Sequence, residues 1–404
     1  MLGWSVVGFI VIVWIITLFR QPTQAVSVLL IFSIIYYDNF IINIQVDLIL
    51  KVLFLLTVIA VGFKIGFVKK YLFATISLAL CIYFLSIIHA QWTYNYSVLD
   101  SITAFASLTI GLLFFCVNFN ERQEFQILNI ISVLALASLI MGIPLGLLHL
   151  VDYFGRDGLA LAGASLATNL SFFGTVGIMA AETLKNRTGL TKYRWLEYIN
   201  FLIVCATLTR GGILASFIVL IPELLEFLKL AINKVKFFMT LFVGLIILIY
   251  PVKLLYNEII QRTFQNGELN TSGRFDAWNH IISITNNKWY GNGYGYLKTM
   301  TGDSQLVAFT AAHNEYIRSY FETGLLGSVL LSIILLSIFY WVLKFRSTKK
   351  IDYVLMCCIA VLVYSFTDNC ITNFRFWIPV MCVLSCIVKQ QNSFRLTLKG
   401  NKGI

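Results

Sequence analysis

The feature that most constrains this chain is the recurrence of long apolar stretches. Runs of about 18 or more apolar residues follow one another, and each is long enough to cross a hydrocarbon core of about 30 Å as a helix. Of the 404 residues, 59% are hydrophobic and only 12% are charged, whereas soluble domains contain roughly 25% charged residues. The ten-residue alternation of an outer-membrane barrel is absent, so the sequence predicts an all-α polytopic membrane protein.

The apolar pattern predicts one integral-membrane domain over residues 1–404, with about 12–13 transmembrane helices. The first segment lacks a charged start and a cleavage site, so we interpret it as a retained span. The first two spans are ambiguous, because together they could form one span with a re-entrant piece. The expected spans are 3–19, 25–45, 48–63, 71–90, 100–118, 125–150, 160–181, 195–209, 211–228, 237–255, 323–343, 352–368 and 372–388.

The distribution of Lys and Arg predicts the orientation, because basic loops remain in the cytoplasm. Basic clusters fall within 64–70, 185–194, 229–236 and 344–350 and in the tail from Lys389. Alternating crossings then place 91–101, 150–158, the corner at Arg210 and the long polar stretch 256–322 outside. We expect residues 256–322 to form a large periplasmic catalytic loop that contains short helices.

Two other classes of function are disfavoured by the residues. The net charge of +11 comes from loops scattered between spans, and no basic face with interleaved aromatic residues exists to bind nucleic acid. The eight cysteines lie mostly inside apolar spans, without a CxxC pair or a histidine at metal-ligand spacing. We therefore expect neither a metal site nor a disulfide framework.

Arginines predicted on the outer side call for a partner, because they oppose the bias that keeps basic residues inside. Arg210 ends one span and precedes Gly211-Gly212, which opens the next. Paired glycines let a ligand approach backbone N–H groups, and a helix start adds partial positive charge. This pattern predicts an anion site, although a snorkelling arginine is the alternative. Arg156 is another arginine on this side.

Arg274 lies in the predicted outer loop, within a short amphipathic segment that Ser272 could cap. A helix there, with Trp278 at headgroup depth, would set Arg274 at the mouth of a cavity. Its forked guanidinium group suits phosphate. The alternative is an ordinary salt bridge to Asp276 or Glu268.

His313 is the predicted proton acceptor, since histidine titrates near neutral pH. Asn314 and Glu315 beside it could fix the ring or share the proton, and we also expect both to contact the substrate. The glycine cluster, residues 291–295, has no preceding strand and no following GK[ST], so it predicts a turn that lets the chain double back rather than a phosphate loop.

The order of these motifs resembles the O-antigen polymerase and O-antigen ligase superfamily. The resemblance covers about 170 residues, from Gly155 to Gly327. It also includes the overall layout of many spans with short loops and one large outer loop. The motifs that carry it are Gly155-Arg156, Asn169, Thr209-Arg210-Gly211-Gly212, Ser272-Gly273-Arg274, Trp278, Gly291-Asn292-Gly293-Tyr294-Gly295, His313-Asn314-Glu315-Tyr316 and Glu322-Thr323-Gly324-Leu325-Leu326-Gly327.

The resemblance implies an inverting, metal-independent glycosyltransferase of the bacterial inner membrane that needs no cofactor. Its donor would be an oligosaccharide linked to undecaprenyl diphosphate, and its site would face the periplasm. Arg210 and Arg274 would hold the diphosphate, His313 would activate the acceptor, and Arg156 would be auxiliary. Arg318 has no counterpart in the motifs, and we regard it as a further contact to phosphate.

Three functions remain open at this point. A polymerase would use another lipid-linked repeat unit as acceptor, and a ligase would use the lipid A core. The forms Ser-Gly-Arg and His-Asn-Glu-Tyr favour the polymerase of O-antigen or capsular polysaccharide, and a protein that regulates chain length would be a further partner. A flippase for lipid-linked oligosaccharide is the alternative from another class, but the internal repeat and mid-membrane polar residues typical of transporters are absent.

Overall fold

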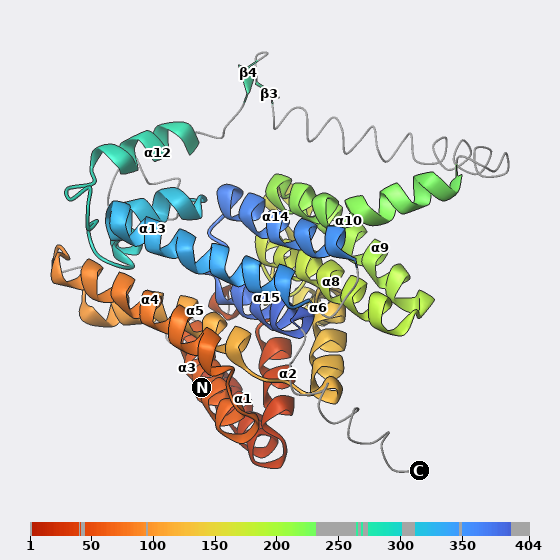
Figure 1. Ribbon diagram of the computed structural model, residues 1–404. Coiled ribbons are helices and arrows are strands. Elements are labelled where there is room, and N and C mark those ends of the chain that lie inside the picture. The colour runs from red at the N-terminus through yellow and green to blue at the C-terminus, as the bar shows by residue number, and fades with distance from the viewer. Residues whose placement is uncertain are drawn as a thin grey trace, which may run out of the picture.

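The computed structural model of this protein describes residues 2–39, 41, 45–93, 96–231, 264–265, 268–269, 274–300, 312–346 and 350–388. Most of these residues are helical, and each of the four short strands contains only two residues. The elements, labelled in Figure 1, are α1 (Leu2–Arg20), α2 (Pro22–Phe32), η1 (Tyr37–Asn39), α3 (Val46–Ile65), α4 (Lys69–Ile88), α5 (Val98–Cys116), α6 (Glu121–Leu147), β1 (Phe154–Gly155), α7 (Arg156–Leu159), β2 (Ala160–Leu161), α8 (Ala167–Thr188), α9 (Thr191–Ala206), α10 (Arg210–Ala231), β3 (Phe264–Gln265), β4 (Glu268–Leu269), α12 (Arg274–Ser283), η2 (Tyr296–Thr299), α13 (Glu315–Lys344), α14 (Ile351–Thr367) and α15 (Phe374–Ile387).

The predicted all-α polytopic membrane fold is confirmed. Within the described residues, six helices are long and apolar enough to cross a membrane. The described part of the predicted outer loop contains the short elements α12 and η2. The expected span over 237–255 lies outside the described residues. The six long helices are Gly3–Arg20, Val46–Ile65, Lys69–Ile88, Val98–Cys116, Glu121–Leu147 and Glu315–Lys344.

The expected span over residues 25–45 is wrong. The chain instead forms α2, which has 11 residues, and later the single 3₁₀ turn η1. At 1.5 Å per residue, α2 is about 16 Å long, too short for a hydrocarbon core of about 30 Å. The helix stops at Ser33, whose hydroxyl bonds back to the Leu30 carbonyl. The carbonyls of Ser33 and Ile35 then accept hydrogen bonds from Arg375 at the start of α15.

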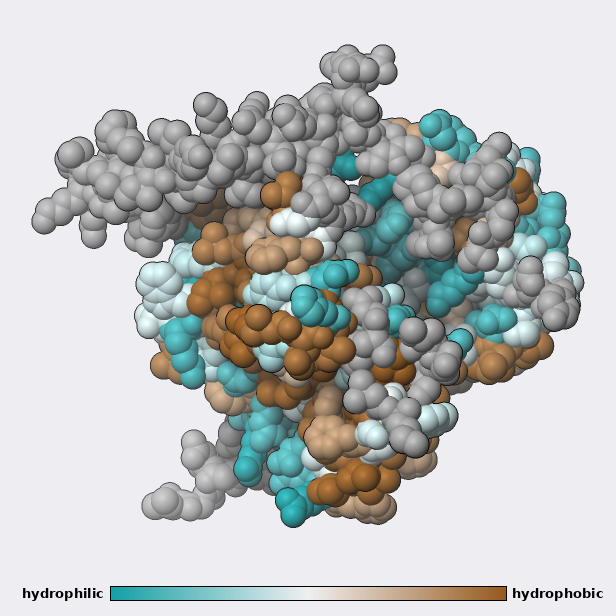
Figure 2. All heavy atoms as spheres, turned by 180° about the vertical axis from the view of Figure 1, so that it is seen from behind, coloured by the Kyte–Doolittle hydropathy of each residue, from teal (hydrophilic) through white to brown (hydrophobic). Residues whose placement is uncertain are grey.

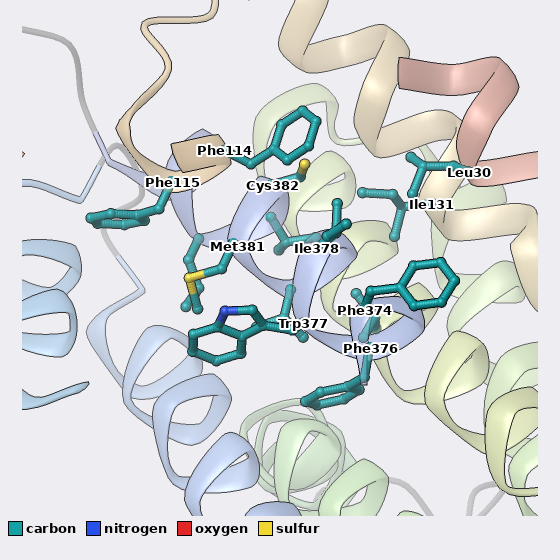
Figure 3. Close-up of a cluster of buried hydrophobic side chains, with 14 of the residues drawn as sticks. Leu30, Phe114, Phe115, Ile131, Phe374, Phe376, Trp377, Ile378, Met381 and Cys382 are labelled. Atoms are coloured by element: carbon teal, nitrogen blue, oxygen red, sulfur yellow. The ribbon is translucent and has the colours of Figure 1, made fainter. Parts of the chain in front are cut away.

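Helix α15 forms the centre of the apolar core. All of its residues are buried, which is the behaviour of a helix that is hydrophobic on every side. Figure 3 shows Trp377, Met381 and Cys382 of α15 in one cluster with Phe114 and Phe115 of α5. The indole N–H of Trp377 donates to the Leu108 carbonyl at 3.1 Å, so the polar group of this large buried side chain has a hydrogen-bond partner. Helices α5, α6 and α8 all pack against α15, which fixes where the start of α15 lies.

Helix α13 is broken at Gly324, where φ is 66°. The glycine cluster of residues 291–295 packs against this break. The backbone N–H of Asn292 donates to the Phe321 carbonyl at 2.9 Å, and that of Leu325 donates to the Lys288 carbonyl at 2.8 Å. The chain therefore doubles back at the cluster as expected. The segment of α13 before the break belongs to the polar loop, and the segment after it matches the expected span 323–343.

The two ends of the helix bundle carry different groups. Basic residues gather at one end, where Arg187 bonds to Glu124 at 2.6 Å and Lys350 bonds to Glu226 at 3.1 Å. The opposite end holds the starts of α3, α5, α8, α10 and α15, together with α12 (Figure 1). Figure 2 shows broad hydrophobic surfaces and, on the side where α12 lies, a recess with hydrophilic walls. The basic residues at that end include Arg122, Lys185, Arg187, Arg194, Lys344, Arg346 and Lys350.

Candidate functional site

The polar corner between α14 and α15 joins several residues that are distant in sequence. Helix α14 ends at Thr367, and Asp368 is its C-cap. The backbone N–H of Asn369 donates to Asp368 Oδ1 at 2.8 Å, which holds the carboxylate in place. The same oxygen lies 3.2 Å from Nδ1 of His313. A carboxylate in this position orients an imidazole ring and selects which ring nitrogen carries the proton.

His313 is held by both of its neighbours in the chain. The Ala312 carbonyl accepts a hydrogen bond from Trp278 Nε1 at 2.7 Å. Asn314 is the N-cap of α13, and its side chain accepts from the Tyr316 N–H at 3.0 Å. His313 itself has a φ of 46°, a left-handed conformation that costs a non-glycine residue roughly 1–3 kcal/mol. The surrounding contacts offset this cost, and such strain is concentrated at functional sites.

Two arginines flank the residue before Asp368. Arg274 begins α12, and its Nη1 donates to the Thr367 carbonyl at 3.0 Å. Arg210 begins α10, and the next residue, Gly211, lies so close to Thr367 that a Cβ atom would collide with the threonine side chain. The N-terminus of α10 adds partial positive charge at the same place. The structure thus brings Arg210, Arg274 and His313 to one corner of the fold.

A cavity of about 590 Å³ lies beside this corner. His313 and Asp368 line the cavity, whereas Arg210 and Arg274 do not. The His313–Asp368 pair therefore stands between the two arginines and the cavity. The other walls come from the starts of α3, α5, α8 and α15 and from η2. The remaining charged residues in these walls are Asp38, Asp47, Lys51, Asp100, Lys298, Arg318 and Arg375.

Arg318, predicted as a phosphate contact, is buried and held by two carboxylates. Its Nη1 donates to Glu315 at 3.0 Å, and its Nη2 donates to Glu322 at 2.6 Å. The second oxygen of Glu315 accepts from Thr372 at 3.3 Å. Arg318 and Glu315 therefore hold the start of α13 to the α14–α15 corner. Their predicted contact with substrate stays a prediction, as does that of Asn314.

Arg156 begins the four-residue helix α7, which lies in the turn of the β1–β2 hairpin. Its side chain lies outside the part that the structure describes. The predicted auxiliary role of Arg156 therefore stays a prediction.

Three residues of the site were not selected from the sequence. Asp368 stood at the edge of an expected span, and its contact with His313 joins positions 55 residues apart. Lys51 and Lys298 line the cavity from α3 and η2. One signal was available for Lys51, because a lysine near the outer end of a span opposes the cytoplasmic bias of basic residues. No comparable local signal marked Asp368.

The fold and the site define a multi-pass helical membrane protein with a cationic corner and a polar cavity at one end of the bundle. Residues 198–332 match the sequence model of the O-antigen ligase family, and this segment contains Arg210, Arg274, His313 and Arg318. The resemblance to the O-antigen polymerase and ligase superfamily is confirmed over this segment.

One curated relative adds a second similarity. The chain is 24% identical over 230 residues to an uncharacterised protein of Haemophilus influenzae, and the match covers 52% of this chain and 55% of that protein. The chain thus spans about half the length of the curated relative that it matches.

Proposed function

We propose that this protein transfers a glycan from an undecaprenyl-diphosphate-linked donor to an acceptor glycan at the periplasmic face of the bacterial inner membrane. The observation that carries the proposal is the position of the His313–Asp368 pair between two arginines and a polar cavity. The match of residues 198–332 to the O-antigen ligase family supports it. This arrangement suits a reaction that needs an anion site, a base and an acceptor site side by side.

Arg210 and Arg274 are the proposed diphosphate site. In an inverting displacement, an acceptor hydroxyl attacks C1 of the donor sugar, and the bond from C1 to the diphosphate oxygen breaks. Negative charge grows on that oxygen, and fixed cationic donors stabilise such charge more strongly in a site shielded from water than in bulk solvent. The partial positive charge at the start of α10 acts in the same direction. The leaving group is already activated, so the proposed reaction requires no metal.

His313 is the proposed general base. If Nδ1–H donates to Asp368, then Nε2 is the nitrogen that takes the proton of the acceptor hydroxyl. Asp368 would hold this tautomer and offset the positive charge that the ring gains. General-base catalysis of this kind contributes roughly 10²–10⁴-fold to a rate. The cavity on the other side of the pair is the proposed acceptor site.

The charge at the two ends of the bundle supports the proposed side of the membrane. Basic residues collect at the end opposite the site, and such residues favour the cytoplasm.

Among the described residues, one group of carboxylates has metal-ligand spacing. It lies at the basic end, away from the proposed site, and Lys185 bonds to its members. These carboxylates are Glu182, Glu197 and Glu223.

The polymerase is our first proposal for the overall reaction, and the ligase is the second. Both use the same donor chemistry and differ in the acceptor. A flippase fits less well, because the charged residues that the structure describes collect at the two ends of the bundle rather than at mid-membrane.

Deletion of the gene in its host, followed by gel analysis of the surface glycan, separates these cases. A single repeat unit on the core indicates a lost polymerase, and a bare core with accumulated lipid-linked polymer indicates a lost ligase. An unchanged ladder would refute the proposal. Complementation with Arg122→Gln, at the basic end of the bundle, should restore the ladder, and complementation with His313→Ala should not.

A further inference from the structure

Several of the charged residues that line the cavity already have polar partners. Arg375 bonds to both oxygens of Asp47 at 2.6 Å. Asp100 accepts from the backbone and hydroxyl of Ser97 in a capping box. Arg318 is held by two glutamates, and His313 contacts Asp368. These contacts account for the polar geometry of the walls, and they leave two cations to explain.

Lys51 and Lys298 are these two cations. Lys51 makes one long hydrogen bond, 3.4 Å, to the Thr103 carbonyl and lies 5.8 Å from the ring centroid of Phe374. The Lys298 ammonium group makes neither a hydrogen bond nor an ion pair with any part of the chain that the structure describes, and only its backbone N–H donates, to the Gly295 carbonyl at 3.3 Å. The two ammonium groups come from α3 and η2, and they are close enough to repel each other.

The surroundings of Lys51 and Lys298 disfavour the charged form of their ammonium groups when no ligand is bound. The Lys298 side chain keeps contact with water in the cavity, and the neighbouring protein removes part of its hydration. Burial lowers the pKa of the Lys298 ammonium group, and the nearby charge of Arg318 lowers it further. The carboxylates of Glu322, Asp47 and Asp100 act in the opposite direction. A bound anion between the two like charges would add to their effect, offset the repulsion and compensate for the hydration that the ammonium groups have lost.

We infer that the cavity binds an acceptor glycan that carries an anionic substituent, a carboxylate or a phosphate ester, held between Lys51 and Lys298. The inference rests on the proposed function and specifies its acceptor. His313 lines the same cavity, so a sugar anchored through its anion presents hydroxyl groups toward the proposed base. The lipid diphosphate binds elsewhere, at Arg210 and Arg274, because neither arginine lines the cavity.

The test measures binding to the full chain in lipid nanodiscs. The probes are trigalacturonate, its neutral methyl ester and farnesyl diphosphate. We expect the wild type to bind trigalacturonate at least about tenfold more tightly than the ester, since a charge-assisted hydrogen bond is worth about this factor. Lys51→Gln and Lys298→Gln should each lower trigalacturonate affinity about tenfold and leave farnesyl diphosphate binding unchanged.

Matched variants separate charge from folding. Lys298→Arg keeps the charge and should retain most of the affinity for trigalacturonate. Lys288→Gln removes an exposed lysine of the same loop that does not line the cavity, and it should change nothing. Retained binding of farnesyl diphosphate shows that a variant is folded, and if Lys51→Gln does not fold, Lys298→Gln in the loop carries the test.

Two outcomes overturn the inference. Equal affinity for trigalacturonate and its ester, including no binding of either, would show that the cavity does not select an anion. Loss of farnesyl diphosphate binding in folded Lys298→Gln protein would show that the lysines hold the lipid headgroup. Neither outcome affects the surface-glycan ladder of the deletion strain, so failure of the inference is distinguishable from failure of the proposed function.

Discussion

The Nδ1 atom of His313 lies 3.2 Å from Oδ1 of Asp368, although the two residues are 55 positions apart. Each is held by its own surroundings. His313 lies between a residue bonded to Trp278 and the N-cap of α13, and Asp368 caps α14. The pair is therefore prepared before any substrate arrives, which is what a positioned base requires.

Replacing Asp368 with Asn tests the orientation of the ring. An amide of the same size can donate to Nδ1, which leaves the proton on the wrong nitrogen for a base. We expect a fall in kcat of about 10²–10⁴-fold with little change in KM for the donor. The pH–rate profile should also change, because the charge beside the imidazole is removed. A variant with wild-type kcat would rule out the positioning role.

Loss of Arg210 or Arg274 should weaken diphosphate binding, whereas loss of an arginine elsewhere on the surface should not. Arg210→Gln and Arg274→Gln are each expected to weaken farnesyl diphosphate binding by about tenfold or more, because a charge-assisted contact is lost. Arg274→Lys should recover only part of the affinity, since lysine lacks the forked geometry. Arg122→Gln, an exposed arginine at the basic end, is the matched control. Wild-type affinity in both glutamine variants would refute the diphosphate site.

Arg318→Met is expected to destabilise the fold. It removes a buried cation and leaves Glu315 and Glu322 unpaired, at a cost of about 3–5 kcal/mol. Thermal unfolding of the detergent-solubilised protein measures the effect. The triple variant with Glu315→Gln and Glu322→Gln should recover part of the loss, because the unpaired charges are gone. If the single variant keeps its melting temperature and loses donor binding, Arg318 is a substrate contact rather than a structural one.

Gly324→Ala tests the break in α13. Gly324 has a φ of 66°, and a Cβ atom would collide with the backbone of Trp289. Strain of this kind costs roughly 1–3 kcal/mol, so a clear drop in the melting temperature is expected. Gly8→Ala is the control, because Gly8 lies in α1 and a Cβ atom there meets nothing within 4 Å. Equal melting temperatures for the two variants would contradict the role of the break.

Binding of trigalacturonate should depend on pH through Lys298. The pKa of its ammonium group is lowered by burial, so the proton is lost at a lower pH than that of an ordinary lysine, near 10.4. The protonated form binds the anion, and affinity should therefore be constant at low pH and fall as pH rises through the lowered pKa. Arginine stays charged throughout, so Lys298→Arg should weaken this decline, and Lys51, the second ammonium group of the site, accounts for what remains. Titration of the affinity between about pH 6 and pH 10 measures it.

The parts of the fold that local pattern controls were predictable. Apolar runs predicted the six helices that are long and apolar enough to cross a membrane, and the glycines beside the polar loop predicted the turn. The span over 25–45 failed because its later carbonyls bond to Arg375, a residue more than 300 positions away. A hydropathy pattern is local and does not indicate a hydrogen-bond donor that is so distant in the sequence.

The site was predictable only where a residue violated a local expectation. Arg210 and Arg274 were selected because arginine is unusual on the outer side. Asp368 was missed because a single carboxylate after a span is ordinary, and only the fold shows that it meets His313. Lys298 was missed because a lysine in a polar loop is unremarkable until the cavity around it is known.

The break at Gly324 also has a mechanical consequence. The first segment of α13 is tied to the glycine cluster by backbone hydrogen bonds, and the second segment alone continues into the apolar span. A hinge of this kind separates the tilt of the span from the orientation of the segment that follows His313. Bilayers of different thickness tilt transmembrane helices, and here the tilt would be absorbed before it reached the imidazole.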